Sequence, residues 1–219
     1  NYGVGARTLL NKGDHPYMKE QAYRDALAFE PDIVTIKLGT NDSKITATEK
    51  GTYKVGIWDK RGAAENFKAE YREMLDIYFN MESKPFVYCM LPPPALPNEV
   101  APNYRITDAN MKNEIIPIIN EVIAECQAEG LPVGTIDIRS AFPDPETQQA
   151  ELVKVLADGV HPNAAGYTIM AETIYKQMLS DTHTLSYSAE GVDDANNVPK
   201  GTTFFGNAEI KVKSTRGLV

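Results

Sequence analysis

The alternation of short apolar segments with amphipathic segments constrains the fold of this chain more than any other sequence feature. Three segments rich in Val, Ile, Tyr and Phe are each bounded by Gly, Pro or polar residues, as buried parallel strands are: 32–38, 85–91 and 133–138. Apolar residues recur every three or four positions around them, which predicts helices over 18–29, 64–80, 108–129 and 164–179. Strands that alternate with helices predict an α/β fold with a parallel sheet and right-handed connections.

Two residues mark where these helices are expected to break or begin. Pro117 lies inside the segment 108–129. Because proline lacks the N–H that an α-helix needs and its ring crowds the preceding turn, we expect this helix to kink or split there. Asn163 directly precedes the last helical segment, and its side chain is well suited to accept hydrogen bonds from the first free amides of that helix.

The character of the chain changes after residue 180. Residues 183–219 have no helical periodicity, and 202–205 and 208–212 have the composition of strands. The sequence therefore predicts an α/β domain over 1–180 and a small β-rich appendage, or the start of a following domain, over 181–219.

Composition excludes several classes of protein. The 22 Lys and Arg residues against 30 Asp and Glu residues give a net charge of −8, which argues against a nucleic-acid-binding protein. No apolar run approaches the roughly 20 residues of a membrane span, so no membrane partner is expected. Cys89 and Cys126 lie in apolar runs and are expected to be buried free thiols. The three histidines include no His-x-x-x-His pair, so a zinc site is not expected. No other cofactor is expected either.

In open parallel sheets, ligands bind beyond the carboxyl ends of the strands, and a polar cluster follows the first predicted strand there. This cluster is Gly39-Thr40-Asn41-Asp42. The Asn41 amide can donate a hydrogen bond into the crevice, as an oxyanion hole requires. The Asp42 carboxylate can accept hydrogen bonds from backbone amides and hold the turn. An ordinary Asn-Asp turn at the start of a loop is the alternative interpretation.

A second cluster, Asp158-Gly159-Val160-His161-Pro162-Asn163, precedes the last predicted helix. If the backbone turns back on itself, the Asp158 carboxylate can hold the Nδ1–H of His161 and leave Nε2 free as a general base. Since an Asp three residues before a His also arises by chance, a structural histidine is the alternative for this motif taken by itself.

The N-terminal turn, Gly3-Val4-Gly5-Ala6-Arg7-Thr8, is a third candidate. Small residues let backbone N–H groups approach a ligand, so this turn can supply a further oxyanion donor. A tight connection between a strand and a helix is the alternative.

Together, the order and spacing of the three clusters resemble the SGNH hydrolases, the GDSL-type esterases and lipases. Residues 1–8 resemble the second conserved block of that family, 39–42 the third and 158–163 the fifth, so the resemblance covers residues 1–180. It implies a three-layer, flavodoxin-like fold. By this resemblance His161 is the base, Asp158 its partner and Asn41 an oxyanion donor. The resemblance implies substrate-binding roles for four further residues of the clusters: Gly39, Asp42, Gly5 and Ala6.

The chain departs from the family pattern at two points. The glycine whose amide helps to form the family's oxyanion hole aligns with Ala6, and alanine resists a positive φ. The nucleophile block, Gly-Asp-Ser in the family, is absent from the 219 residues, and Ser43 beside Asn41 is a poor substitute. In the family this block lies on a central first strand, whose loss would leave unpaired strand edges and an apolar gap.

Three explanations for the missing block are open at this point. A segment before Asn1 is missing from the sequence, an N-terminal fragment of the same protein stays bound as a separate chain, or residues 208–212 fill the gap in a catalytically inactive relative. We take the first as the working hypothesis and Asn1 as a truncated or processed start.

The resemblance implies a serine esterase that hydrolyses small acyl esters, acetyl esters above all, on carbohydrates, with the serine outside this sequence. The acylated carbohydrate, or another small ester, is the expected partner. The tripeptide Lys12-Gly13-Asp14, followed by His15, also resembles family members that cleave carbohydrate esters, although His15 can equally be a plain loop residue. The alternative function is a catalytically inactive domain for carbohydrate binding or scaffolding. By family resemblance, the expected location is secreted or periplasmic.

Overall fold

The computed structural model describes residues 1–100, 104–180, 183–184 and 203–204, and divides into two units, Asn1–Thr173 and Ile174–Val219. In the second unit β6 (His183–Thr184) pairs antiparallel with β7 (Thr203–Phe204), which lies within the segment 202–205 predicted as a strand. The predicted strand 208–212 lies outside the described residues. The division into 1–180 and 181–219 stays a prediction.

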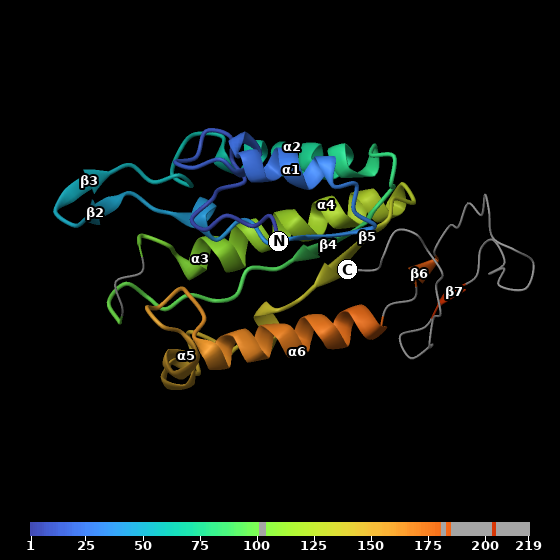
Figure 1. Ribbon diagram of the computed structural model, residues 1–219. Coiled ribbons are helices and arrows are strands. Elements are labelled where there is room, and N and C mark those ends of the chain that lie inside the picture. Colours follow the sequence, from blue (N-terminus) through green and yellow to red (C-terminus); the bar gives the residue numbers. More distant parts are fainter. Residues whose placement is uncertain (101–103, 181–182, 185–202, 205–219) are drawn as a thin grey trace, which may run out of the picture. The chain divides into compact units, whose positions relative to one another are not determined.

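A three-stranded parallel sheet forms the centre of the first unit (Figure 1). Its strands are β1 (Ile33–Ile36), β4 (Phe86–Met90) and β5 (Val133–Ile136), in the order β1-β4-β5. The α/β fold with a parallel sheet is therefore confirmed, and each strand lies inside the segment predicted for it. Burial explains the composition of the central strand, because Val87, Tyr88 and Cys89 of β4 are fully buried between its two neighbours.

Helices cover both faces of this sheet (Figure 1). On one side lie α1 (Gln21–Ala28), α2 (Ala63–Phe79) and α4 (Ile116–Ala128), while the N-terminal part of α6 (Ala164–Ser180) lies on the other. The helical periodicity marks the face that packs into the core, where these side chains are buried: Phe67, Tyr71, Leu75, Ile119 and Ile123. Both cysteines are buried and free, as predicted.

The predicted helix 108–129 is split ahead of Pro117. It consists of α3 (Asp108–Asn110), a single π-helical turn, η3 (Met111–Ile115), and α4, which has Pro117 in its first turn. The split agrees with the prediction, since a proline is tolerated in the first turn of an α-helix and not further inside. The first predicted helix begins later than expected, because Tyr17–Lys19 forms a separate 3₁₀ turn (η1) before α1.

Several short elements were not predicted. A hairpin of β2 (Ala47–Glu49) and β3 (Thr52–Lys54) projects from the end of the sheet where the strands have their carboxyl ends (Figure 1). Lys50 and Gly51 connect its strands, both with positive φ, as a tight hairpin turn requires. The other short elements that were not predicted are η2 (Asn41–Ser43), η4 (Arg139–Ala141) and α5 (Gln149–Val155).

Strand β1 forms one edge of the sheet. The Asp32 carbonyl accepts a hydrogen bond from the Phe86 amide, so every second residue from Asp32 onward turns its backbone groups toward β4. The backbone groups of Ile33, Thr35 and Lys37 consequently point to the opposite side, where no strand of the described sheet pairs with them.

Candidate active site

A cleft of about 500 Å³ lies beyond the carboxyl end of β1. All three predicted clusters contribute to its lining, through Gly5, Ala6, Gly39, Asn41 and His161. His15 lines the cleft as well. This is the position that the topology predicts for a ligand, since the loops that follow parallel strands meet at one end of the sheet.

The Asp158–His161 pair has the geometry of a base and its orienting carboxylate. His161 Nδ1 lies 2.8 Å from Asp158 Oδ2 and 3.1 Å from Oδ1. The loop closes on itself because Gly159 has a positive φ and the His161 backbone amide also donates to Asp158, over 2.9 Å. With Nδ1–H directed at the carboxylate, Nε2 is the nitrogen left to accept a proton. The His161 side chain is 60% exposed, so a reacting group can reach it.

The pKa of Asp158 reflects two opposing effects. Partial burial raises it, whereas hydrogen bonds from the backbone amides of Val160 and His161 and from the His161 ring lower it. The hydrogen bonds outweigh burial, and the net pKa lies below the usual value. The carboxylate is therefore ionised at neutral pH, as the candidate role of His161 as a base requires.

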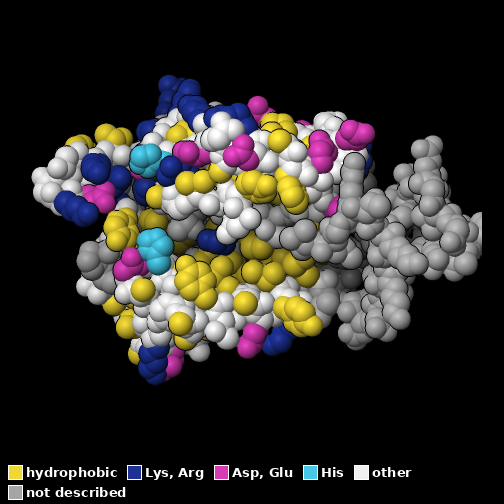
Figure 2. All heavy atoms as spheres, viewed as in Figure 1, with side chains coloured by type: hydrophobic (Ala, Val, Ile, Leu, Met, Phe, Trp, Pro, Cys, Tyr) yellow, Lys and Arg dark blue, Asp and Glu magenta, His cyan; other side chains and the backbone are white. Residues whose placement is uncertain are grey.

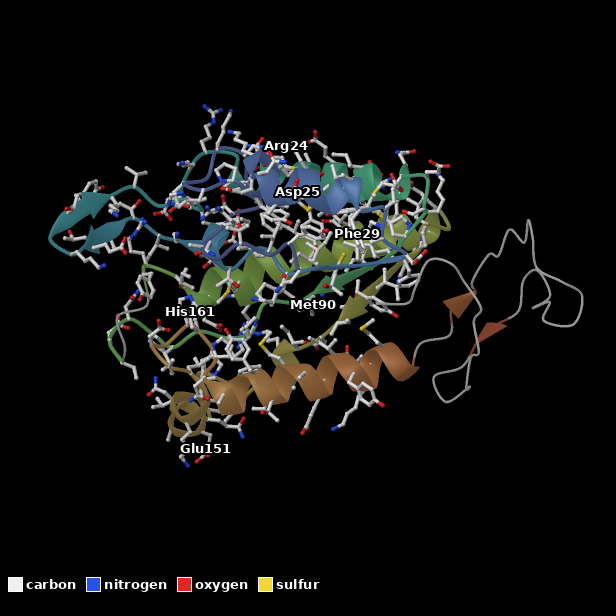
Figure 3. The ribbon with its side chains drawn as sticks, in the orientation of Figure 1. Arg24, Asp25, Phe29, Met90, Glu151 and His161 are labelled. Atoms are coloured by element: carbon white, nitrogen blue, oxygen red, sulfur yellow. The ribbon has the colours of Figure 1, made fainter. Side chains whose placement is uncertain are left out.

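The ends of α5 and α6 hold this loop in place. The Ala157 amide donates to the His161 carbonyl over 2.7 Å. Asn163 caps α6 as predicted, because its Oδ1 accepts hydrogen bonds from the amides of Ala165 and Gly166. Its Nδ2 donates to the Lys154 carbonyl, so one side chain connects the two helices that flank His161 (labelled in Figure 3).

Asn41 faces the cleft from the first turn after β1. Its side-chain amide has no hydrogen-bond partner in the described part of the chain and is free to donate to a ligand. The preceding Gly39 has a φ of 114°, and a Cβ there would lie 2.9 Å from Ile115 Cγ2, so only glycine fits. Ser43 is buried and its hydroxyl donates to the Thr40 carbonyl, which removes it from the cleft.

Asp42 lies outside the cleft lining and acts on the loop beside it. Its buried carboxylate accepts the amides of Leu9 and Leu10 at 3.0 and 2.9 Å. Burial raises its pKa to about 6, although the two amides oppose the shift. This carboxylate joins the N-terminal loop, which carries Gly5 and Ala6, to the turn that carries Asn41.

Ala6 adopts the left-handed conformation, with a φ of 63°. The expected resistance of alanine to positive φ is thus overcome by the surrounding structure, at a cost of roughly 1–2 kcal/mol. The amides of Gly5 and Ala6 have no acceptor among the described residues, so both are available as donors at the cleft.

Sequence motifs did not identify two further residues of the cleft, Lys37 and Tyr104. Lys37 remains accessible from the cleft, but the surrounding protein reduces hydration of its ammonium and lowers its pKa. Tyr104 lies beside His161. Lys37 lies in the predicted strand, two residues before Gly39, whereas Tyr104 is far from all three clusters along the chain and only the tertiary fold brings it to His161. Among the described residues, no group of three His, Cys, Asp or Glu side chains is arranged to hold a metal ion.

Residues 1–169 match the model of the GDSL-like lipase/acylhydrolase family, which covers more than half of the chain. The chain belongs to this family. The resemblance to SGNH hydrolases is thereby confirmed, and the expected enzyme class, carboxylic ester hydrolase, agrees with it. All three predicted clusters lie within the matched region.

Among characterised relatives, an acetylxylan esterase of Xylanibacter ruminicola is 37% identical to this chain over 183 residues. The match covers 80% of this chain and 34% of that protein, so the chain spans about a third of the length of this relative. Among solved structures, a carbohydrate esterase family 3 protein from Talaromyces cellulolyticus matches with a TM-score of 0.50 and 20% identity, over 75% of this chain and 68% of that one. At 20% identity, this second match shows similarity of the fold alone. No helix in the described ranges is long and apolar enough to cross a membrane.

Proposed function

We propose that this chain is part of a serine esterase that removes acetyl groups from a carbohydrate. The observation that carries the proposal is that His161, held by Asp158, lines one cleft together with the free amides of Asn41, Gly5 and Ala6. The relative that hydrolyses acetylxylan supports acetyl as the acyl group and a xylan-type carbohydrate as the alcohol. A secreted or periplasmic location goes with this proposal, since such polysaccharides lie outside the cell.

In this mechanism, a serine hydroxyl attacks the acetyl carbonyl while His161 Nε2 takes the hydroxyl proton. Asp158 holds the imidazole in the required tautomer and stabilises its charged form. The carbon–oxygen bond to the sugar then breaks as His161 returns the proton to the sugar oxygen. Water repeats the sequence on the acetyl-serine and releases acetate.

The oxyanion that forms in both steps requires donors aimed at one point. Asn41 Nδ2 and the amides of Gly5 and Ala6 approach the cleft from two different loops, and the Asp42 carboxylate fixes one loop to the other. Removal of one such donor typically costs about 2.7–4 kcal/mol in activation free energy.

The serine is proposed to come from outside these 219 residues. None of the described residues that line the cleft is a serine. A groove of about 680 Å³ runs along the free edge of β1 and shares Val4, Lys37, Leu38 and Tyr167 with the cleft. Phe29 and Met90, both labelled in Figure 3, also line it.

The groove is lined largely by hydrophobic side chains, and Figure 2 shows a hollow with such a floor beside the histidines. A further strand, paired parallel with β1 in this groove, would end beside His161. A serine at its carboxyl end would then meet Nε2. A segment of the same protein, covalently continuous with Asn1 or bound as a fragment, is the proposed source.

A fluorophosphonate probe tests the proposal on the protein that carries this further segment. We expect covalent labelling of one serine and turnover of p-nitrophenyl acetate, with both lost in His161→Ala. Asn41→Ala is expected to lower kcat by about 10²–10³-fold. Undiminished turnover in His161→Ala would refute the assignment.

The absence of a serine from the described cleft lining favours one second candidate, a carbohydrate-binding domain without catalysis. This alternative would be supported if the protein that carries the further segment binds xylo-oligosaccharides but shows neither labelling by the fluorophosphonate probe nor turnover of p-nitrophenyl acetate.

A further inference from the structure

Two consecutive residues at the rim of the cleft have an unusual backbone conformation. Tyr104 and Arg105 have φ values of 58° and 67°, in the left-handed region that residues with a Cβ rarely adopt. The conformational strain of two such residues in succession has to be offset by favourable contacts elsewhere. Strained backbone of this kind tends to occur at functional sites.

The side chain of Arg105 provides the compensation. It is buried, and its Nε donates to Glu49 Oε2 over 3.0 Å, while Nη1 lies 3.3 Å from the carbonyl oxygens of Ile45 and Val55. The Arg105 carbonyl accepts the Ile45 amide over 3.0 Å.

Glu49 belongs to the β2–β3 hairpin, which therefore acts as the anchor of this turn. Burial raises the pKa of Glu49, but the hydrogen bond and charge of Arg105 and the charge of Lys54 outweigh burial and lower it. The ion pair persists for this reason throughout the neutral range.

The ring of Tyr104 contributes little to the packing of the protein. It remains 42% exposed, and its hydroxyl makes no hydrogen bond to any residue that the structure describes. The turn instead places the ring edge-to-face against His161, with centroids 5.9 Å apart and planes at 75°. The fold thus holds an accessible aromatic ring directly beside the candidate base.

We propose that Tyr104 is a substrate contact that receives the apolar face of the sugar ring whose ester is cleaved. The inference rests on the proposed function: His161 returns its proton to the sugar oxygen, so the sugar must lie within hydrogen-bond reach of this histidine and hence beside Tyr104. A pyranose ring has a C–H face that packs on the electron-rich face of an aromatic ring. The hydroxyls at its edge can be bound by charged groups that also line the cleft: Asp14, Lys44, Glu49 and Lys54.

Binding of xylopentaose to the 219-residue chain tests this contact without any need for the nucleophile. Chemical-shift titration or calorimetry should give a dissociation constant that rises about tenfold in Tyr104→Ala, equivalent to about 1.4 kcal/mol. Tyr104→Leu, which keeps an apolar side chain, should weaken binding similarly, whereas Tyr104→Phe should bind like the parent chain.

Tyr53→Ala is the matched control, because Tyr53 is an exposed tyrosine of the neighbouring hairpin that does not line the cleft. Its binding should equal that of the parent chain. Equal binding by Tyr104→Ala and the parent, or no binding of xylopentaose by the parent at millimolar concentration, would overturn the inference. Either result is distinguishable from failure of the esterase assignment, which the serine probe and His161→Ala decide separately.

Discussion

At the scale of single residues, the cleft depends on side chains that hold backbone amides in unusual places. Ala6 has a positive φ that glycine would adopt without cost, and Asp42 is a buried carboxylate that binds two amides. Both fix the loop that carries two of the candidate oxyanion donors, and each makes a measurable prediction.

Ala6→Gly is expected to raise the free energy of unfolding by about 0.5–1 kcal/mol, because relief of the left-handed strain exceeds the entropy that glycine adds to the unfolded chain. Urea denaturation followed by circular dichroism measures the change. Gly5→Ala is the matched control: its φ is not in the left-handed region, and the new Cβ would meet no atom within 4 Å. A lower stability of Ala6→Gly would contradict the strain argument.

Asp42 makes a prediction about pH. Its pKa is about 6 in the folded chain and near the ordinary value of 3.8 in the unfolded chain. Between these values the unfolded chain releases the proton and the folded chain retains it, so the free energy of unfolding falls as the pH rises through this window. Above about pH 6 the loss is complete.

Asp42→Asn removes this titration and should therefore flatten the pH dependence of stability between pH 4 and pH 6 relative to the parent chain. Urea denaturation at several pH values measures the difference. Asp25→Asn, which changes an exposed carboxylate on α1, should leave the parent profile unchanged. Parallel profiles for Asp42→Asn and the parent would show that the carboxylate is already ionised at low pH in the folded chain.

At the scale of elements, the sequence was informative wherever a local pattern determines the structure. The strands and main helices follow from apolar periodicity, the split at Pro117 from its missing N–H, and the cap of α6 from Asn163. The β2–β3 hairpin has little apolar alternation, and all of β3 is exposed, so periodicity gave no signal for it. Its Lys50-Gly51 turn was the one local indication.

In the candidate site, too, local motifs predicted some residues, and tertiary structure alone brings another one in. Asn41, Asp158 and His161 lie in recognisable clusters. Tyr104, in contrast, contacts His161 from a distant turn, which the Arg105–Glu49 ion pair connects to the β2–β3 hairpin. A contact of this kind depends on tertiary structure and has no local pattern.

Asn163 provides a prediction at this scale, because one side chain caps α6 and also donates to the end of α5. Asn163→Ala is expected to lower the free energy of unfolding by about 1–2 kcal/mol. Asn163→Asp keeps the capping oxygen and loses only the hydrogen bond to Lys154, so it should retain most of the stability. Equal losses in both variants would show that the link to α5 matters more than the cap.

At the scale of the whole α/β unit, the site and the free edge of β1 form one continuous surface. The groove beside β1 opens into the cleft that contains His161, and the two share Val4, Tyr167 of α6, and Lys37 and Leu38, which directly follow β1. An exposed apolar groove beside unpaired backbone groups is unfavourable for an isolated domain and favourable for one that receives a strand. A strand added at this edge, with a serine at its carboxyl end, would therefore both cover the apolar groove and supply the missing nucleophile.

Hydrogen exchange can test that strand directly. In the 219-residue chain, the amides of Ile33, Thr35 and Lys37 point to the free edge and should exchange rapidly, whereas those of Val34 and Ile36 bond to β4 and should be protected. In protein that carries the additional segment, the first three amides should become protected as well, and the last two serve as an internal control. If the first three are protected already in the 219-residue chain, another part of this chain occupies the edge. If they remain unprotected in both proteins, no strand pairs with β1, and the serine must reach His161 by another route.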